Sequence, residues 1–169
     1  MSKTVIIEHN LSKEEKYEAL SAQMQHLLEE DDLILTNLSN FIAAINQSFE
    51  TISWIGFYFM RNNALHLGPF QGKTACTLIE LGKGVCGDSA KQRKTIIVPD
   101  VDQYPGHIAC DSASRSEIVI PLIQNSILYG VLDVDSSYLN NFDDTDRIYL
   151  EQLCNTLFHF VNFEKFILT

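Results

Sequence analysis

The sequence predicts an α+β domain in which helices pack against an antiparallel sheet. Apolar residues recur at helical spacing in two segments before residue 50 and in one after residue 142. Between these segments lie short stretches rich in β-branched and aromatic residues, separated by turn residues. Several of the separations have hairpin length, which favours antiparallel pairing over crossover connections. No linker or repeat divides the chain, so we expect a single domain over residues 1–169.

Three long helices are expected, two of them within about residues 11–49. The first follows Ser12, whose hydroxyl suits an N-cap ahead of acidic residues in the first turn. The second covers residues 33–49, and the last covers about residues 142–166 behind Asp143 or Asp144 as its N-cap. The buried stripes are predicted at Tyr17, Leu20, Met24, Leu27 and Leu28, at Leu35, Leu38, Phe41, Ile42 and Ile45, and at Leu150, Leu153, Leu157 and Phe160.

The sheet and its loops are expected at about residues 51–136. We predict strands at residues 51–60, 64–70, 76–81, 95–98, 116–123 and 126–135. Gly68 and Pro69 are interpreted as the end of the second strand, and Gln124 with Asn125 as the turn of the last hairpin. A short helix is expected to follow Gly84 and to end near Arg93.

Composition argues against several classes of partner. The chain has 12 basic and 22 acidic side chains, which give a net charge of −10. Such a charge disfavours nucleic acid and anionic membranes as partners. The N-terminal residues lack the apolar segment and cleavage site of a signal peptide, and no apolar run approaches the length of a membrane helix. We therefore expect a cytoplasmic protein.

Three of the four cysteines, Cys76, Cys86 and Cys110, fall in predicted loops or at strand ends. Cys154 lies in the last helix and is interpreted as a small buried hydrophobe. The other three allow three interpretations. They could be unrelated buried thiols, or zinc ligands together with His107. They could also include a redox pair, in which one thiolate attacks a substrate and another closes a disulfide. No pair has the short C-x-x-C spacing of zinc sites, so we expect no metal.

The segment from Pro105 to Pro121 changes from loop to buried strand and carries His107, Cys110 and Asp111. A loop held by a rigid strand is a common place for binding and catalysis. The alternative is a surface connection with an incidental cysteine. The candidate chemistry of the chain is therefore centred on this segment.

Carboxylates form a second group of candidates. Glu117 begins one strand of the late hairpin, and Asp133 and Asp135 lie near the end of the other. Alternation places both aspartates on one sheet face, where they repel each other unless a cation or a proton is present. A substrate ammonium would meet that need. A solvated strand end is the alternative interpretation.

Aromatic residues form a third group. Trp54 and Tyr58 share one face of the first strand, with Gly56 between them on the same side. A glycine in this position would leave room for a ligand between two aromatic walls, although the pattern alone is more typical of core residues. The alternative is that both rings belong to the core.

Five motifs occur in an order that resembles the free methionine-(R)-sulfoxide reductases, which are stand-alone GAF domains. They are GPFQGKTAC at residues 68–76, GVCG at 84–87, GHIACD at 106–111, SEIVIP at 116–121 and GVLDVDS at 130–136. A single motif of this kind is weak evidence, whereas five in order that include three cysteines are specific. The differences, at Thr74, Thr77, Leu78 and residues 112–115, remove no functional residue.

The resemblance implies a six-stranded antiparallel sheet, an enclosed ligand pocket and a homodimer. It implies an oxidoreductase that reduces free L-methionine-(R)-sulfoxide without a metal or organic cofactor and is recycled by thioredoxin. Cys110 would be the nucleophile and Cys76 the main resolving thiol, with Cys86 as the other candidate. The substrate would be bound by Trp54, Tyr58, Glu117, Asp133 and Asp135.

The implied reaction needs an acid as well as thiols. The sulfoxide oxygen must gain protons before the S–O bond breaks, and Glu117 or Asp135, kept protonated by crowding and an apolar pocket, is a suitable donor. Cys110 would be left as a sulfenic acid that a second thiol converts to a disulfide. The competing class is a GAF-type sensor that binds a small ligand, or senses redox state through cysteines, without turnover.

Overall fold

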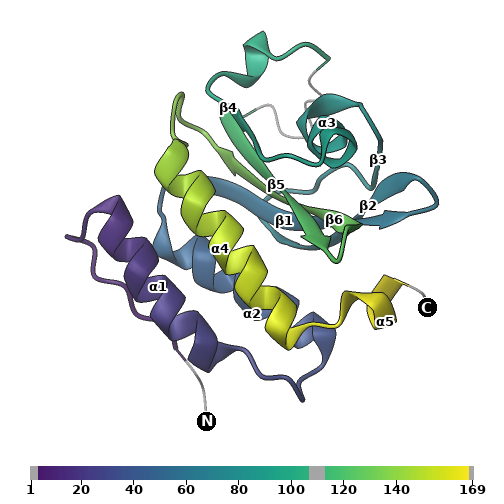
Figure 1. Cartoon of the computed structure of the whole chain (residues 1–169). Coiled ribbons are helices and arrows are strands. Elements are labelled where there is room, and N and C mark those ends of the chain that lie inside the picture. The colour runs from purple at the N-terminus through teal and green to yellow at the C-terminus, as the bar shows by residue number, and fades with distance from the viewer. Residues whose placement is uncertain (1–3, 107–112, 168–169) are drawn as a thin grey trace.

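A computed structural model of the chain describes residues 4–106 and 113–167. Its centre is a six-stranded antiparallel sheet in the order β3-β2-β1-β6-β5-β4 (Figure 1). The strands are β1 (Ile52–Arg61), β2 (Ala64–Gln71), β3 (Leu78–Glu80), β4 (Ile96–Val98), β5 (Ser116–Gln124) and β6 (Ile127–Ser136). The helices are α1 (Lys13–Leu27), α2 (Ile34–Ser48), α3 (Gly84–Gln92), η1 (Val101–Gln103), α4 (Asp144–Phe160) and α5 (Phe163–Ile167). The predicted α+β class with six antiparallel strands is confirmed.

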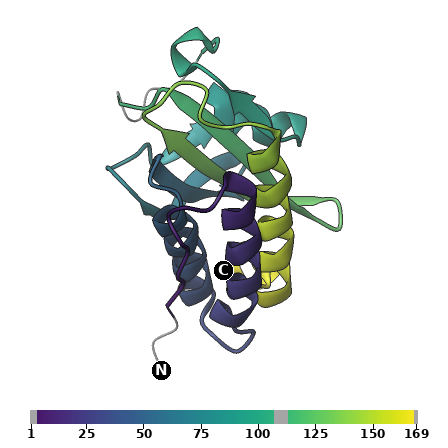
Figure 2. The ribbon, with the colours of Figure 1, turned by 90° about the vertical axis from the view of Figure 1, so that its left-hand side faces the viewer.

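Helices cover both faces of the sheet. The long helices α1, α2 and α4 lie on one face and the short α3 on the other, as two perpendicular views show (Figures 1 and 2). Strand β1 is therefore buried on both sides: Ile55 and Phe57 pack with the long helices, whereas Trp54 and Tyr58 pack with α3. No helix within the described ranges is long and apolar enough to span a membrane.

The predicted caps of the long helices are present. Ser12 caps α1 in a reciprocal box with Glu15. Asp143, rather than Asp144, caps α4. The two helix starts are joined by Lys13, whose Nζ lies 2.8 Å from Asp143 Oδ2 and 2.6 Å from Asp146 Oδ2. This network fixes the layer of long helices against which the sheet packs.

The prediction of one continuous C-terminal helix is wrong. Helix α4 ends at Phe160, and α5 begins at Phe163. Val161 has extended backbone angles, and its side chain and that of Phe163 are both buried in the core. The Asn37 amide donates a hydrogen bond to the Phe160 carbonyl, which takes that acceptor out of the helical ladder. Burial of two apolar side chains thus outweighs continuation of the helix.

The predicted stripe of α2 is correct except at Leu35. Its side chain is 54% exposed, whereas Leu38, Phe41 and Ile45 are buried. Asn37 is fully buried in the position where the stripe continues, and its Nδ2 donates to the carbonyl of Glu29 at 2.7 Å. A hydrogen-bonded polar residue therefore replaces the leucine on the buried face.

Two strand boundaries also differ from the prediction. Strand β2 continues through Gly68 and Pro69 to Gln71, because these two residues together oppose Phe57 at a register shift. Pro69 needs no ladder donor at such a bulge. The hairpin between β5 and β6 turns at Asn125 and Ser126, which both have positive φ, one residue later than predicted.

Candidate active site on the α3 face of the sheet

Three acidic residues lie on the sheet face that α3 covers. Glu117 on β5 pairs directly with Asp135 on β6, and Asp133 lies between Gly56 of β1 and Val119 of β5. Val134 points to the opposite face, into the core beneath the long helices. The predicted common face of Asp133 and Asp135 is confirmed, and hairpin register adds Glu117 to it.

Cys86 completes a compact cluster with two of these acids. Its Sγ and carboxylate oxygens of Glu117 and Asp133 lie within 4.8 Å of one another, and all three side chains are buried. We call these three residues the acid–thiol cluster. The Cys86 thiol and the Glu117 carboxyl both hydrogen-bond to Asp133. The second Asp133 oxygen, Oδ1, is buried without a hydrogen-bond partner.

Burial sets the protonation of the cluster. Desolvation, followed by the charges of Asp133 and Asp135, raises the pKa of Glu117 well above its ordinary value. Desolvation also raises the pKa of Asp133, to about 6, against the lowering effect of its hydrogen bonds. The pKa of the Cys86 thiol is raised well above its ordinary value, first by burial and then by Asp133. At neutral pH, Glu117 and Cys86 therefore hold protons and donate to Asp133.

The cluster is also the one group of Cys, His, Asp and Glu side chains in the described ranges that is close enough to share a metal ion. A metal ligand must be deprotonated. The raised pKa values of Cys86 and Glu117 oppose that change. The chemistry of the cluster thus favours proton donation over metal binding.

Trp54 and Tyr58 of β1 lie beside the acid–thiol cluster on the same face of the sheet. The Trp54 ring stacks on Phe70 with centroids 5.5 Å apart and lies 6.0 Å from the Tyr58 ring. Its Nε1 donates to the Lys73 carbonyl at 2.9 Å. Burial, then Asp133 and Cys86, raise the pKa of Tyr58, so its hydroxyl stays neutral.

The predicted role of Gly56 is wrong. A Cβ there would lie 2.5 Å from both Trp54 Cη2 and Phe70 Cβ. The glycine therefore makes room for the indole of Trp54 and leaves no free space for a ligand directly above the strand. If Trp54 contacts a ligand, it does so with a part of its ring other than the edge that covers Gly56.

The structure places the cysteines in different settings. Cys86 and Cys154 are buried free thiols, whereas Cys76 is partly exposed and disulfide-bonded. Cys76 precedes β3, where the prediction had it inside the strand. His107, Cys110 and Asp111 lie outside the described residues. Burial raises the pKa of Cys154, which agrees with the prediction of an inert core thiol.

The chain on either side of residues 107–112 is held by hydrogen bonds, on one side to α3 and on the other to the end of β6. The Tyr104 hydroxyl donates to Asp88 Oδ2 of α3 at 2.8 Å, and burial followed by this bond raises the pKa of Tyr104 to about 12. The amide of Arg115 donates to the Ser136 carbonyl at 2.7 Å. Sequence reasoning missed the Tyr104–Asp88 contact, because it joins two elements that no motif links.

Gly87 sets the distance between α3 and β3. A Cβ on Gly87 would overlap the carbonyl oxygen of Glu80 and lie 3.0 Å from the amide nitrogen of Gly82. The Gly82 amide donates to the Gly87 carbonyl at 2.8 Å across the same contact. The second glycine of GVCG therefore lets α3 approach the backbone closely enough to carry Cys86 to the acids.

Replacing Gly87 with alanine should destabilise the fold by about 2–3 kcal/mol, because the added methyl group overpacks a backbone contact. Alanine's better helix propensity would offset about 1 kcal/mol of that cost at most. Urea unfolding measures the change, with the exposed Gln92→Ala in the same helix as a near-neutral control. Equal stability of both variants would contradict the close-approach role.

Comparison with known proteins assigns the family. A GAF-domain model matches residues 28–158. The free methionine-R-sulfoxide reductase of Saccharomyces cerevisiae is 44% identical over 156 residues, which cover 88% of this chain and 87% of that protein. This chain belongs to the free methionine-R-sulfoxide reductase family. The family is one of oxidoreductases built on a GAF domain.

Two further comparisons find proteins that resemble this chain over most of its length. GAF domain-containing protein A of Dictyostelium discoideum is 50% identical over 147 residues, covering 86% of this chain and 92% of that protein. The structure of the Neisseria meningitidis free methionine-R-sulfoxide reductase in complex with its substrate superimposes with a TM-score of 0.85. It is 40% identical and covers 91% of this chain and 93% of its own. The fold that carries the acid–thiol cluster is thus the fold of the family.

Proposed function

We propose that this chain reduces free L-methionine-(R)-sulfoxide to L-methionine and oxidises two of its own cysteines to a disulfide in each cycle. The observation that carries the proposal is the acid–thiol cluster, in which a protonated Glu117 and a protonated Cys86 surround Asp133. A sulfoxide oxygen must be protonated as its bond to sulfur breaks. A buried carboxylic acid that keeps its proton at neutral pH supplies it.

The acids also suit the polar end of a free amino acid. Asp133 Oδ1 has no hydrogen-bond partner in the described structure, which is costly for a buried carboxylate. The ammonium group of the substrate would satisfy this oxygen, with Asp135 beside it. Trp54 and Tyr58 would contact the S-methyl end. A methionine sulfoxide within a protein has no such ammonium and would leave the acids unpaired, so the free amino acid is preferred.

The proposed reaction starts at Cys110. Its thiolate attacks the sulfoxide sulfur while Glu117 protonates the oxygen. The S–O bond of the substrate breaks, the protonated oxygen is transferred to the Cys110 sulfur to give a sulfenic acid, and methionine leaves with the electron pair. The Cys76 thiol then attacks the sulfenic sulfur, releases water and forms a Cys76–Cys110 disulfide. The substrate gains two electrons and the two thiols lose them. A dithiol protein such as thioredoxin restores the thiols.

The states of the cysteines support this division of roles. Cys76 is disulfide-bonded and partly exposed, as a resolving cysteine must be when a reductant reaches it. Cys86 is free, and its raised pKa keeps it a protonated and therefore weak nucleophile. We assign Cys86 to hydrogen bonding within the acid–thiol cluster.

Replacing Cys76 with serine should limit the reduced protein to roughly one methionine per active site when thioredoxin is the reductant. The sulfenic acid still forms on Cys110, but the disulfide that thioredoxin recognises does not. Rapid quenching and chromatography of methionine measure the burst, and Cys154→Ser serves as a control with normal turnover. Full multiple turnover by Cys76→Ser would assign resolution to Cys86.

The experiment that tests the proposed function counts product. The reduced protein is incubated with free methionine-(R)-sulfoxide and excess dithiothreitol, and the methionine formed is compared with the amount of protein. Many equivalents of methionine identify the reductase. Reversible oxidation of the thiols without methionine would instead identify a redox sensor.

A further inference from the structure

We propose that the outer edge of the sheet beside Cys76 is the docking surface for the protein that reduces the enzyme. The docking surface consists of Leu78, Glu80 and Leu81 at β3 with Lys83 and Lys91 at α3. We infer that its partner is a dithiol protein whose thiols lie in an apolar surface with acidic residues around it. This inference rests on the proposed function, because it concerns how the disulfide is recycled.

The apolar part of the surface lies at an unpaired sheet edge. Among the strands of the described residues, β3 is the last of the sheet and pairs only with β2 (Figure 1). Leu78 is 50% exposed and belongs to neither core cluster, and Leu81 is 36% exposed. Between them Ile79 is buried and fixes the strand. Exposed leucines on a short, well-anchored strand favour contact with a partner over a folding role.

The charge of this region is opposite to that of the whole protein. The docking surface carries two basic side chains, Lys83 and Lys91, and one acidic side chain, Glu80, a net charge of +1 in a chain of −10. Lys91 extends over the turn after β3, with Nζ 3.2 Å from the place of a Cβ on Gly82. Lys83 and Lys91 are both exposed, and neither forms an ion pair with a described residue. These free cations favour an acidic partner.

The disulfide identifies what kind of partner fits. Cys76 lies two residues before Leu78 and is partly exposed, so a partner seated on β3 is beside its sulfur. A thiolate of the partner attacks Cys76 Sγ, forms a mixed disulfide and releases the other enzyme thiolate. The second thiol of the partner then attacks its own sulfur in the mixed disulfide, which frees Cys76 and leaves the partner oxidised by two electrons. A protein reductant must dock on the enzyme so that its thiolate points at Cys76 Sγ. A small dithiol such as dithiothreitol reaches the disulfide without a docking surface.

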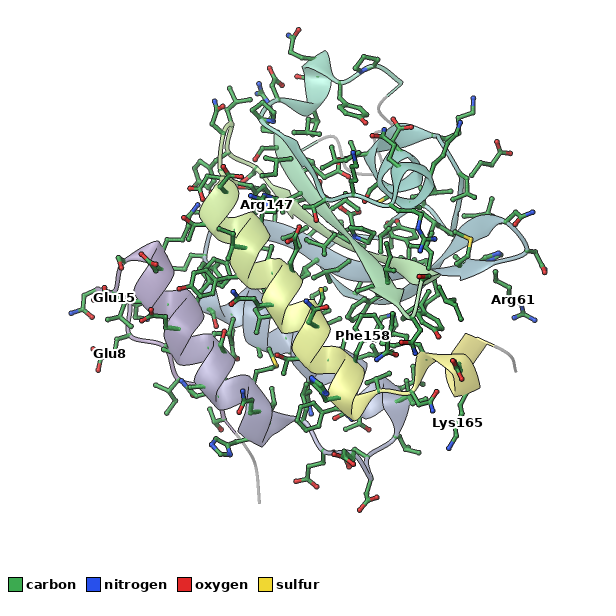
Figure 3. The ribbon with its side chains drawn as sticks, viewed as in Figure 1. Glu8, Glu15, Arg61, Arg147, Phe158 and Lys165 are labelled. Atoms are coloured by element: carbon green, nitrogen blue, oxygen red, sulfur yellow. The ribbon has the colours of Figure 1, made fainter. Side chains whose placement is uncertain are left out.

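The lysines are tested by charge reversal. With a thioredoxin of net negative charge as the probe, Lys83→Glu/Lys91→Glu should lower kcat/KM for the reductant by about tenfold or more at low ionic strength. The loss should shrink as salt screens the charges. Turnover with dithiothreitol should stay at the wild-type rate. The matched control is Lys16→Glu/Lys165→Glu, which changes the net charge equally but at α1 and at α5, where Figure 3 labels Lys165.

The apolar contact is tested separately. Leu78→Ser should raise the KM for the same thioredoxin several-fold without changing turnover with dithiothreitol, whereas Leu35→Ser on the exposed side of α2 should change neither. Unchanged thioredoxin kinetics in both docking variants, or an equal loss in the control pair, would overturn the docking surface. If the wild-type protein formed no methionine with dithiothreitol as the reductant, the proposed function itself would be overturned.

Discussion

Replacing Cys110 with serine should abolish methionine formation, to below about 10⁻³ of the wild-type rate, whether thioredoxin or dithiothreitol is the reductant. A serine hydroxyl at neutral pH is far less nucleophilic than a thiolate, and it cannot pass through a sulfenic acid. Because the first chemical step is lost, there should also be no burst of methionine. This separates Cys110→Ser from Cys76→Ser, which keeps the burst.

Cys86→Ser and Cys154→Ser are the comparisons for this result. Cys154 is buried in α4, in the core beneath the long helices, so its variant should turn over normally. Cys86→Ser should keep the nucleophile but weaken the acid–thiol cluster, giving a lower rate with an intact burst. A burst that survives in Cys110→Ser and vanishes in Cys86→Ser would move the nucleophile to Cys86.

Glu117→Gln should lower the rate of methionine formation by about 10²- to 10⁴-fold while making the protein more stable. The amide of glutamine keeps a hydrogen-bond donor toward Asp133 but cannot release a proton to the sulfoxide oxygen. It also removes an acid from a crowded, buried site. Loss of activity together with a gain in stability is expected of a residue retained for chemistry.

The gain in stability should grow as pH rises. In the folded protein the pKa of Glu117 is raised well above 4.5, so above that pH the unfolded chain loses this proton while the folded one keeps it. The folded state then binds more protons, and the free energy of unfolding falls by about 1.4 kcal/mol per pH unit until the folded pKa is reached. Glu117→Gln does not lose stability in this way, so its melting temperature should exceed that of the wild type by a margin that grows between pH 5 and 7. Each kcal/mol of difference in the free energy of unfolding should correspond to about 2–4 °C.

Glu80→Gln is the matched control, because Glu80 is exposed at the edge of the sheet. Its melting temperature should follow that of the wild type at every pH. If Glu117→Gln were less stable than the wild type at neutral pH, or as active, Glu117 would not be a buried proton donor.

The sequence could predict which face Asp133 and Asp135 share, because alternation along one strand is local. It could not place Glu117 beside them by geometry. A hairpin turning at Gln124 and Asn125 would pair Glu117 with Leu132 and so put it on the opposite face. The observed turn lies one residue later, and a register shift at Leu122 and Ile123 brings Glu117 opposite Asp135. The sequence groups Glu117 with them only because it begins the neighbouring strand, and the resemblance to a family implies one shared site.

Contacts between separate elements were the other limit. The sequence shows the motif around Cys86, but how deeply α3 buries that thiol depends on the close approach of Gly87 to the backbone of β3, which no local pattern encodes. Gly56 was read as open space because the sequence does not show that Trp54 folds back over it. The break after Phe160 likewise depends on Asn37, more than a hundred residues away. Each of these features arises from tertiary packing that overrides local preference.

The most direct test of the central claim is a comparison of three substrates in a thioredoxin-coupled assay that follows NADPH oxidation. The substrates are free methionine-(R)-sulfoxide, its S epimer and a peptide that contains the R sulfoxide. A site that binds the ammonium group at buried acids should turn over the free R epimer alone. Comparable rates with the peptide, or turnover of the S epimer instead, would contradict the account.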